Sequence, residues 1–169
     1  MPAITRPSVL ATTATLLTAL LLGAAPADAA TTTTTTTCGS GSCFLDARTG
    51  AHTGYDRLVF DVDGLPTVQS SSVSTSGAYD YNGEKQQNVT IPGKDYLFVN
   101  FTGASLYDNT GLSYTTPSPE AVDLPAIKGV EAVNGFEGYV SFAVSLDAYT
   151  SYNIFTLTDP DRVVIDVSY

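Results

Sequence analysis

The segment Asp56-Arg57-Leu58-Val59-Phe60-Asp61-Val62 decides the fold, because it returns later in the chain as Asp161-Arg162-Val163-Val164-Ile165-Asp166-Val167. Both copies follow the pattern Asp-Arg-aliphatic-Val-apolar-Asp-Val. Apolar side chains alternate with period two in each copy, which is typical of a half-buried strand. The pattern predicts two equivalent strands in a domain with internal pseudo-symmetry. The alternative is that a common amphipathic strand pattern occurs twice by chance.

Alternation gives each copy an inner and an outer face. The side chains expected inside are Leu58, Phe60 and Val62, then Val163, Ile165 and Val167; those expected outside are Arg57, Val59 and Asp61, then Arg162, Val164 and Asp166. If the copies are symmetry mates, Phe60 and Ile165 occupy equivalent core positions. The arginines would then lie on outer strand faces.

The first 29 residues have the layout of a secretory signal peptide. Arg6 precedes an apolar stretch from Val9 to Leu22, and Ala27-Asp28-Ala29 forms a small-x-small cleavage site. The apolar stretch is shorter than the roughly 20 residues that a transmembrane helix needs. We therefore expect cleavage after Ala29 and a secreted product without a membrane anchor.

Residues 30–43 are expected to form a spacer and a small ring. Thr31 to Thr37 is a low-complexity tract with nothing to bury, so it should stay extended. Cys38 and Cys43 are the only cysteines, and export makes a disulfide between them the expected state. A redox pair or half of a metal site is the alternative, but no further cysteine is present to complete a metal site.

Residues 44–169 read as alternating strands and turns, with no sustained helical period. Tyr96 to Thr102 and Tyr139 to Leu146 have the clearest alternation, and Asn82-Gly83 is a typical two-residue hairpin turn. The other expected strands are 44–52, 67–74, 86–91, 127–133 (bulged at Gly129) and 152–157, and residues 103–124 are expected to cross between sheets. Many short strands with regular turns predict an all-β, two-sheet β-sandwich.

Charge limits the partners of this domain. The formal net charge is −10, with 17 acidic and 7 basic residues. Nucleic acid and anionic membranes are therefore not expected as partners, because both require clustered Lys and Arg. The predicted mature length, 169 − 29 = 140 residues, suits one domain that needs no metal to fold, and we expect a monomer.

Three segments together resemble the AMIN-like domain of secreted and lipid-anchored actinobacterial proteins. They are Gly54 to Asp61, Gly135-Phe136-Glu137-Gly138-Tyr139-Val140, and Asp161 to Val167. This family is related to the AMIN domain of cell-wall amidases and secretins. The resemblance covers roughly Asp46 to Tyr169. It implies a symmetric two-sheet sandwich in the cell envelope, and a non-catalytic targeting module that associates with peptidoglycan.

Residues that could perform catalysis or bind metal are few. His52 is the only histidine, lies in a predicted hairpin, and no Gly-x-Ser-x-Gly motif accompanies it. Asp61-Val62-Asp63 and Asp159-Pro160-Asp161 could hold calcium or act as glycosidase acids, but Asp at strand ends more often bonds local backbone amides. We therefore expect no enzyme activity, no metal and no cofactor.

The candidate ligand-binding residues are aromatic and cationic. Tyrosines outside the clearest strands could stack on sugar faces, although they could equally cover loops. The arginines could bind the carboxylate of a stem peptide, or could simply pair with Asp61 and Asp166. These candidates are Tyr79, Tyr81, Tyr107, Tyr114, Arg57 and Arg162.

The sequence thus favours a secreted, non-catalytic envelope module that binds peptidoglycan or another cell-wall component and associates with the wall. A protein-interaction module and a passive surface or structural protein stay open as alternatives. A hydrolase is the least favoured of these functions.

Overall fold

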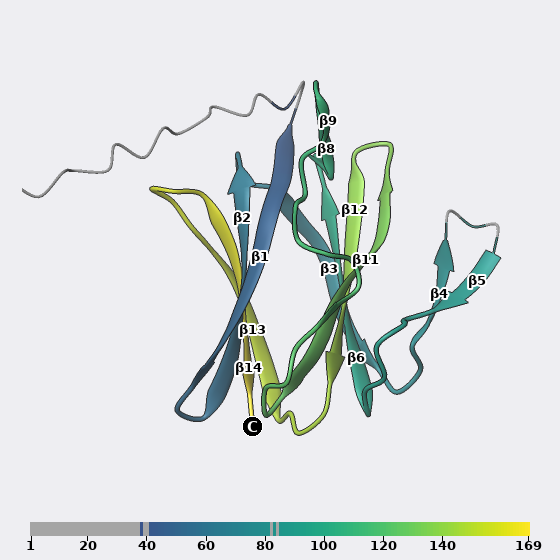
Figure 1. Ribbon diagram of the computed structural model, residues 1–169, viewed down its shortest axis with the longest axis vertical. Coiled ribbons are helices and arrows are strands. Elements are labelled where there is room, and N and C mark those ends of the chain that lie inside the picture. Colours follow the sequence, from purple (N-terminus) through teal and green to yellow (C-terminus); the bar gives the residue numbers. More distant parts are fainter. Residues whose placement is uncertain (1–37, 39–40, 82, 84) are drawn as a thin grey trace, which may run out of the picture. The chain divides into compact units, whose positions relative to one another are not determined.

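The computed structural model describes residues 38, 41–81, 83 and 85–169. The predicted signal peptide and Thr tract lie outside these residues. Two five-stranded sheets pack face to face (Figure 1). Sheet A has the order β13-β14-β2-β1-β7, and sheet B has the order β10-β11-β12-β6-β3. The predicted all-β sandwich is therefore confirmed.

The strands follow the alternation of the sequence closely. Those of sheet A are β1 (Ser42–His52), β2 (Tyr55–Asp63), β7 (Ala104–Ser105), β13 (Ser151–Leu157) and β14 (Arg162–Ser168). Those of sheet B are β3 (Thr67–Ser74), β6 (Asp95–Thr102), β10 (Glu120–Ala121), β11 (Ile127–Phe136) and β12 (Tyr139–Leu146). Two separate hairpins complete the fold: β4 (Ala78–Tyr81) with β5 (Lys85–Asn88), and β8 (Tyr107–Asp108) with β9 (Gly111–Leu112).

The two copies of the repeat lie side by side as β2 and β14. Arg57 pairs with Asp166, Val59 with Val164, and Asp61 with Arg162. Arg57 is equivalent to Arg162 in the repeat, and Asp61 to Asp166, so the Arg57–Asp166 pair and the Asp61–Arg162 pair are related by symmetry. A local twofold axis therefore passes through the Val59–Val164 pair. The predicted pseudo-symmetry is confirmed.

Aromatic side chains from both sheets form the centre of the core. Phe44 of β1 makes edge contacts with Phe60, Phe101 and Phe142, at ring-centroid distances of 5.3, 5.0 and 4.9 Å. All four are fully buried, as is Ile165. Each buried phenylalanine removes a large apolar area from water, so this cluster fixes the spacing of the two sheets.

Three details depart from the sequence predictions. Val164 faces outward but is only 1 % exposed, because it lies on a central strand between Val59 and Phe155. The predicted strand over 86–91 is β5, which ends at Asn88. The β4–β5 turn has three residues rather than two, since Tyr81 pairs with Lys85; of these only Gly83, with a φ of 71°, is described.

The outer face of β12 is also less open than predicted. The alternation over Tyr139 to Leu146 places Ala143 and Ser145 on the outer face, yet both are fully buried. Ser145 Oγ donates to the Ile91 carbonyl at 2.6 Å, and the Ile91 side chain packs over Gly129, where an added Cβ would come within 2.4 Å. The chain between β5 and β6 therefore covers this end of the sheet.

Candidate functional site

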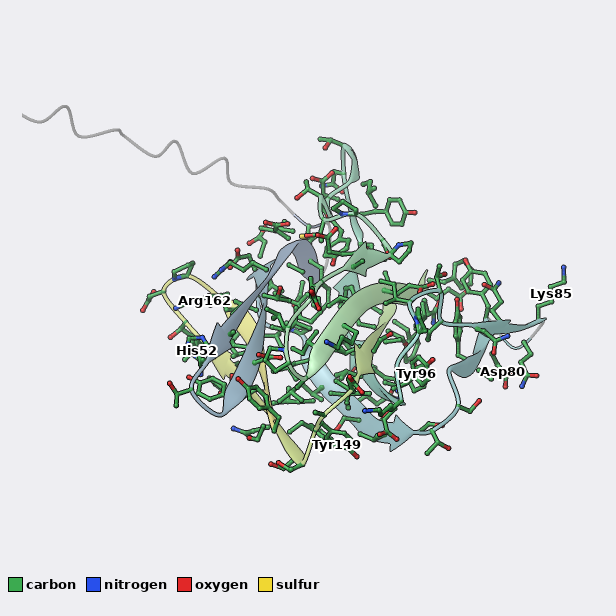
Figure 2. The ribbon with its side chains drawn as sticks, turned by 60° about the horizontal axis from the view of Figure 1, so that its bottom comes forward. His52, Asp80, Lys85, Tyr96, Tyr149 and Arg162 are labelled. Atoms are coloured by element: carbon green, nitrogen blue, oxygen red, sulfur yellow. A yellow bond between two sulfur atoms is a disulfide. The ribbon has the colours of Figure 1, made fainter. Side chains whose placement is uncertain are left out.

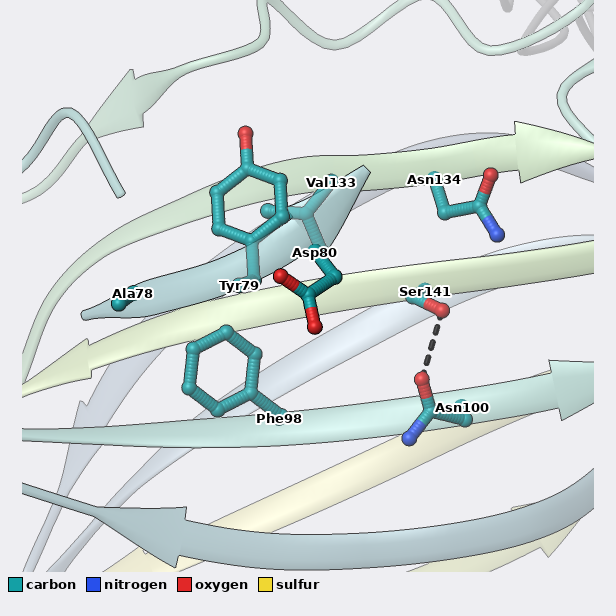
Figure 3. A pocket seen from close by; sticks show the side chains of 8 residues that line it. All are labelled: Ala78, Tyr79, Asp80, Phe98, Asn100, Val133, Asn134 and Ser141. Atoms are coloured by element: carbon teal, nitrogen blue, oxygen red, sulfur yellow. Dashed lines mark hydrogen bonds between the residues drawn. The ribbon is translucent and has the colours of Figure 1, made fainter. Parts of the chain in front are cut away.

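A hollow lies between the β4–β5 hairpin and sheet B (Figure 3). Its volume is about 300 Å³. The hairpin stands apart from the sandwich on the side of sheet B, and its Asp80 and Lys85 lie across the domain from His52 and Arg162 (Figure 2). The lining residues are Ala78, Tyr79, Asp80, Phe98, Asn100, Val133, Asn134 and Ser141.

A row of polar side chains crosses the sheet at this hollow. Strand register places Asn134, Ser141, Asn100 and Ser70 opposite one another on four neighbouring strands. Ser141 Oγ donates to Asn100 Oδ1 at 2.6 Å, and Asn100 Nδ2 donates to Ser70 Oγ at 3.0 Å. Three of the four side chains, Ser141, Asn100 and Ser70, are therefore held in place by hydrogen bonds to one another.

Aromatic side chains form the neighbouring wall. The Tyr79 and Phe98 rings lie 6.5 Å apart, and Tyr79 Oη donates to Gln87 Oε1 at 3.2 Å. A bulge between Ala132 and Asn134 turns Val133 into the same small apolar cluster. Burial raises the pKa of the Tyr79 phenol, and nearby Glu131 raises it further, so this hydroxyl stays protonated at neutral pH.

One acceptor in the hollow has no partner. Asn134 Oδ1 is shielded from solvent and accepts no hydrogen bond from the described residues. An unsatisfied acceptor of this kind costs about 1–3 kcal/mol, which a ligand donor could recover. Asp80 is the one charged side chain among the described lining residues, and its carboxylate lies between the two rings and the polar row in Figure 3.

A buried carboxylate anchors the chain beneath the hairpin. Glu131 of β11 is only 8 % exposed and accepts hydrogen bonds from the Thr90 backbone N–H at 2.7 Å and from Thr90 Oγ1 at 3.2 Å. Thr90 follows β5 by two residues. These bonds fix the base of the hairpin against sheet B, and so fix the width of the hollow.

A second aromatic pair lies one step further along the strands. Phe136 and Tyr139 are cross-strand partners, 55 % and 48 % exposed. Tyr139 lies two residues from Ser141 on β12, which is about 7 Å along a strand on the same face. The polar row thus has aromatic rings on both sides.

The predicted tyrosines are spread over the domain. Tyr79 lines the hollow, and Tyr81, 43 % exposed, follows it on β4. Tyr107 lies on the β8–β9 hairpin and is 54 % exposed. Tyr114 is 4 % exposed and packs on Phe142 at 5.4 Å, so it has almost no surface to offer a ligand. Its burial raises the pKa of the phenol to about 12.

The predicted arginines lie on the outer face of sheet A. Arg57 donates from Nε and Nη2 to Asp166 at 2.6 and 2.8 Å, which raises the pKa of its guanidinium. The Tyr55 and Phe155 rings flank it at 5.4 and 5.6 Å. Arg162 instead donates from Nε to the carbonyl of Pro160, two residues earlier, and Asp61 pairs with Arg48. The structure therefore does not bring the arginines and the tyrosines into one site.

The histidine and the acidic pairs were the candidates for catalysis or metal binding. His52 is exposed and stacks on Tyr55 at 4.7 Å, with the rings 7° apart. Among the residues that the structure describes, no group of three or more His, Cys, Asp or Glu side chains is arranged to hold a metal ion. The described part of the chain also has no helix with the length and apolarity of a membrane crossing.

The cysteines form the predicted disulfide. Cys38 and Cys43 are bonded, with Cα atoms 5.7 Å apart, and Cys43 is fully buried at the start of β1. A structural disulfide is consistent with an extracytoplasmic location.

Four residues that line the hollow were not predicted from the sequence: Phe98, Asn100, Asn134 and Ser141. A signal was present, since Phe98, Asn100 and Ser141 occupy the outward positions of the two strands with the clearest alternation. Asn134 lies just beyond the predicted strand over 127–133, whereas β11 continues to Phe136. What the pattern could not supply was the hairpin that covers these positions.

Comparison with protein families identifies the family of this chain. The family model described as the AMIN-like domain matches residues 43–169. Because the match spans most of the chain, the protein belongs to the AMIN-like family. Domains of this kind are generally non-catalytic modules. A search of curated proteins found no match to this chain.

Proposed function

We propose that this chain is an exported, monomeric, non-catalytic module that binds cell-wall glycan, with peptidoglycan as the polymer. The observation that carries the proposal is the hollow on sheet B, where a polar row lies between two sets of aromatic rings. Rings that stack on sugar faces, beside amides and hydroxyls that bond sugar hydroxyls, are the groups that a glycan site requires.

The charge of the site supports a glycan over other envelope polymers. Among the described residues that line the hollow there is no Lys or Arg, and Asp80 is the one charged group. A polyanionic wall polymer would be repelled by this carboxylate and by the net charge of −10. A largely neutral glycan strand meets no such repulsion.

The decisive experiment is co-sedimentation of the purified exported protein with purified peptidoglycan at low and moderate salt. The wild-type protein is expected in the pellet at both. Asn100→Ala removes the centre of the polar row, so the Ser141 and Ser70 hydroxyls are no longer held in position for a ligand, and binding should weaken about tenfold. Asn153→Ala is the matched control, because Asn153 is exposed on β13 of the other sheet.

A protein partner is the second candidate, on the strength of the β8–β9 hairpin. Tyr107 and Leu112 are cross-strand partners there, 54 % and 63 % exposed. Exposed apolar side chains of this kind favour protein contacts when they group together. Retention of the wild-type protein in the supernatant at both salt concentrations would remove the glycan proposal and leave this one.

A further inference from the structure

We propose that the hollow on sheet B recognises the acetamido group of an N-acetylated sugar. This inference rests on the proposed function, because it names the chemical feature of the glycan that the site selects. An acetamido group combines a methyl, an N–H donor and a carbonyl acceptor. The hollow offers a matching surface to each of the first two.

The methyl group has an apolar wall to contact. Ala78, Val133 and the Phe98 ring line the hollow, and Val133 and Phe98 belong to one apolar cluster. A hydroxyl in the same position would be desolvated against these groups without a partner, which is unfavourable. The wall therefore favours a methyl-bearing substituent over a bare hydroxyl.

The N–H donor has an unoccupied acceptor to meet. The hydrogen bonds along the polar row engage both ends of the Asn100 amide, and the Ser141 hydroxyl donates within the row. Asn134 Oδ1 is the shielded atom of the lining that lacks a partner among the described residues. Because Asn134 lines the hollow, a rotation of its side chain would bring Oδ1 to the hollow, where the N–H of an amide supplies the missing donor without introducing charge.

A free amino sugar fits less well, although Asp80 could attract its ammonium group. Asp80 is exposed, so the attraction is screened by solvent, and an ammonium ion against Val133 and Phe98 would lose hydration. The neutral amide satisfies the apolar wall and the acceptor together.

The test compares three β-1,4-linked oligosaccharides of equal length, built from N-acetylglucosamine, glucosamine or glucose. Titration calorimetry with the disulfide-bonded wild-type protein is expected to give the tightest binding for the N-acetylated oligomer, by at least about tenfold over the other two. That ratio reflects one hydrogen bond and one buried methyl group. Equal binding of the glucose oligomer, tighter binding of the glucosamine oligomer, or no binding of any oligomer would overturn the inference.

Two variants test whether the preference for the N-acetylated oligomer depends on Asn134. Asn134→Ala should reduce affinity for the N-acetylated oligomer about tenfold, and leave the already weak glucose oligomer unchanged; Asn153→Ala should change neither. If Asn134→Ala does not fold, the comparison of the three oligosaccharides with the wild-type protein still decides.

Different results would overturn the inference and the proposed function. Peptidoglycan binding that is sensitive to Asn100→Ala, with all three oligomers bound alike, would retain the function and remove acetamido recognition.

Discussion

Asp56 offers the sharpest test of how the sandwich is held together. Asp56 begins the first copy of the repeat. It alternates in step with Leu58 and Phe60 along β2, so it lies on the same face of the strand and is fully buried in the core. Its Oδ2 accepts the backbone N–H groups of Ala126 and Ile127 at 2.6 and 3.0 Å. One carboxylate of sheet A thus fixes the start of β11 in sheet B. We predict that Asp56→Ala is among the most destabilising polar substitutions in the domain.

The expected loss of unfolding free energy combines the hydrogen bonds that Asp56→Ala removes and the desolvation cost that it relieves. Hydrogen bonds to a charged group contribute about 1.5–3 kcal/mol each, and their loss leaves two buried N–H groups unpaired. Against this, Asp56 Oδ1 is buried with no partner among the described residues, so the native carboxylate already bears a desolvation cost that Ala removes. We expect a net loss of about 3 kcal/mol. Asp56→Asn keeps a neutral acceptor, which bonds roughly half as strongly, and should lose about 1.5 kcal/mol.

The assay is urea unfolding followed by far-UV circular dichroism, with Asp61→Ala as the matched control. Asp61 lies on the same strand but faces outward, where it pairs with Arg48 at the surface, so its removal should cost less than about 1 kcal/mol. A result in which Asp56→Ala is no more damaging than Asp61→Ala would refute the reasoning. The desolvation of the carboxylate would then offset both hydrogen bonds, and the start of β11 would be held by apolar packing alone.

The remaining predictions concern the core and the outer face. The raised pKa of Tyr114 means that the folded state binds its phenolic proton more tightly than the unfolded state, so this contribution is complete below pH 10 and is lost as pH rises toward 12. Denaturant unfolding should show a loss of about 1.4 kcal/mol at pH 11 relative to pH 8, and a Tyr114→Phe variant that retains this loss would contradict the assignment. Phe60→Ala should cost about 3–5 kcal/mol and Arg162→Ala less than about 1. Arg57→Ala should exceed Arg162→Ala in the same assay because of its two bonds to Asp166, and the reverse order would count against that pairing.

Much of the sandwich could be predicted because its strands satisfy one simple rule. In β6 and β12 the alternate residues Leu97, Val99, Val140 and Phe142 are all fully buried, as their period-two spacing indicates. The repeat also predicted the internal pseudo-symmetry, which is present as a local twofold axis between the antiparallel strands β2 and β14. Edges and short strands such as β7 and β10 were not predictable, because two-residue strands carry no period.

The candidate site was harder to predict for a physical reason. Alternation specifies which side chains leave the core, but not what covers them afterwards. Ala143 and Ser145 are outward residues that Ile91 and the chain around it bury, whereas Ser141, two residues away, lines a hollow. The difference arises from long-range contacts such as Glu131 with Thr90, 41 residues apart, which no local pattern contains.

The residues that stabilise the core and the residues of the proposed ligand site lie in different parts of this fold. The repeated strands β2 and β14 lie at the centre of sheet A, so substitutions in the repeat act chiefly on the core. The proposed site instead lies on the outer face of sheet B, beneath a hairpin inserted between β3 and β6. That hairpin pairs with neither main sheet, and its contribution to the hollow comes from Ala78, Tyr79 and Asp80. Residues in it can therefore change while the sandwich is retained, so ligand preference can vary among chains that keep the same repeated strands.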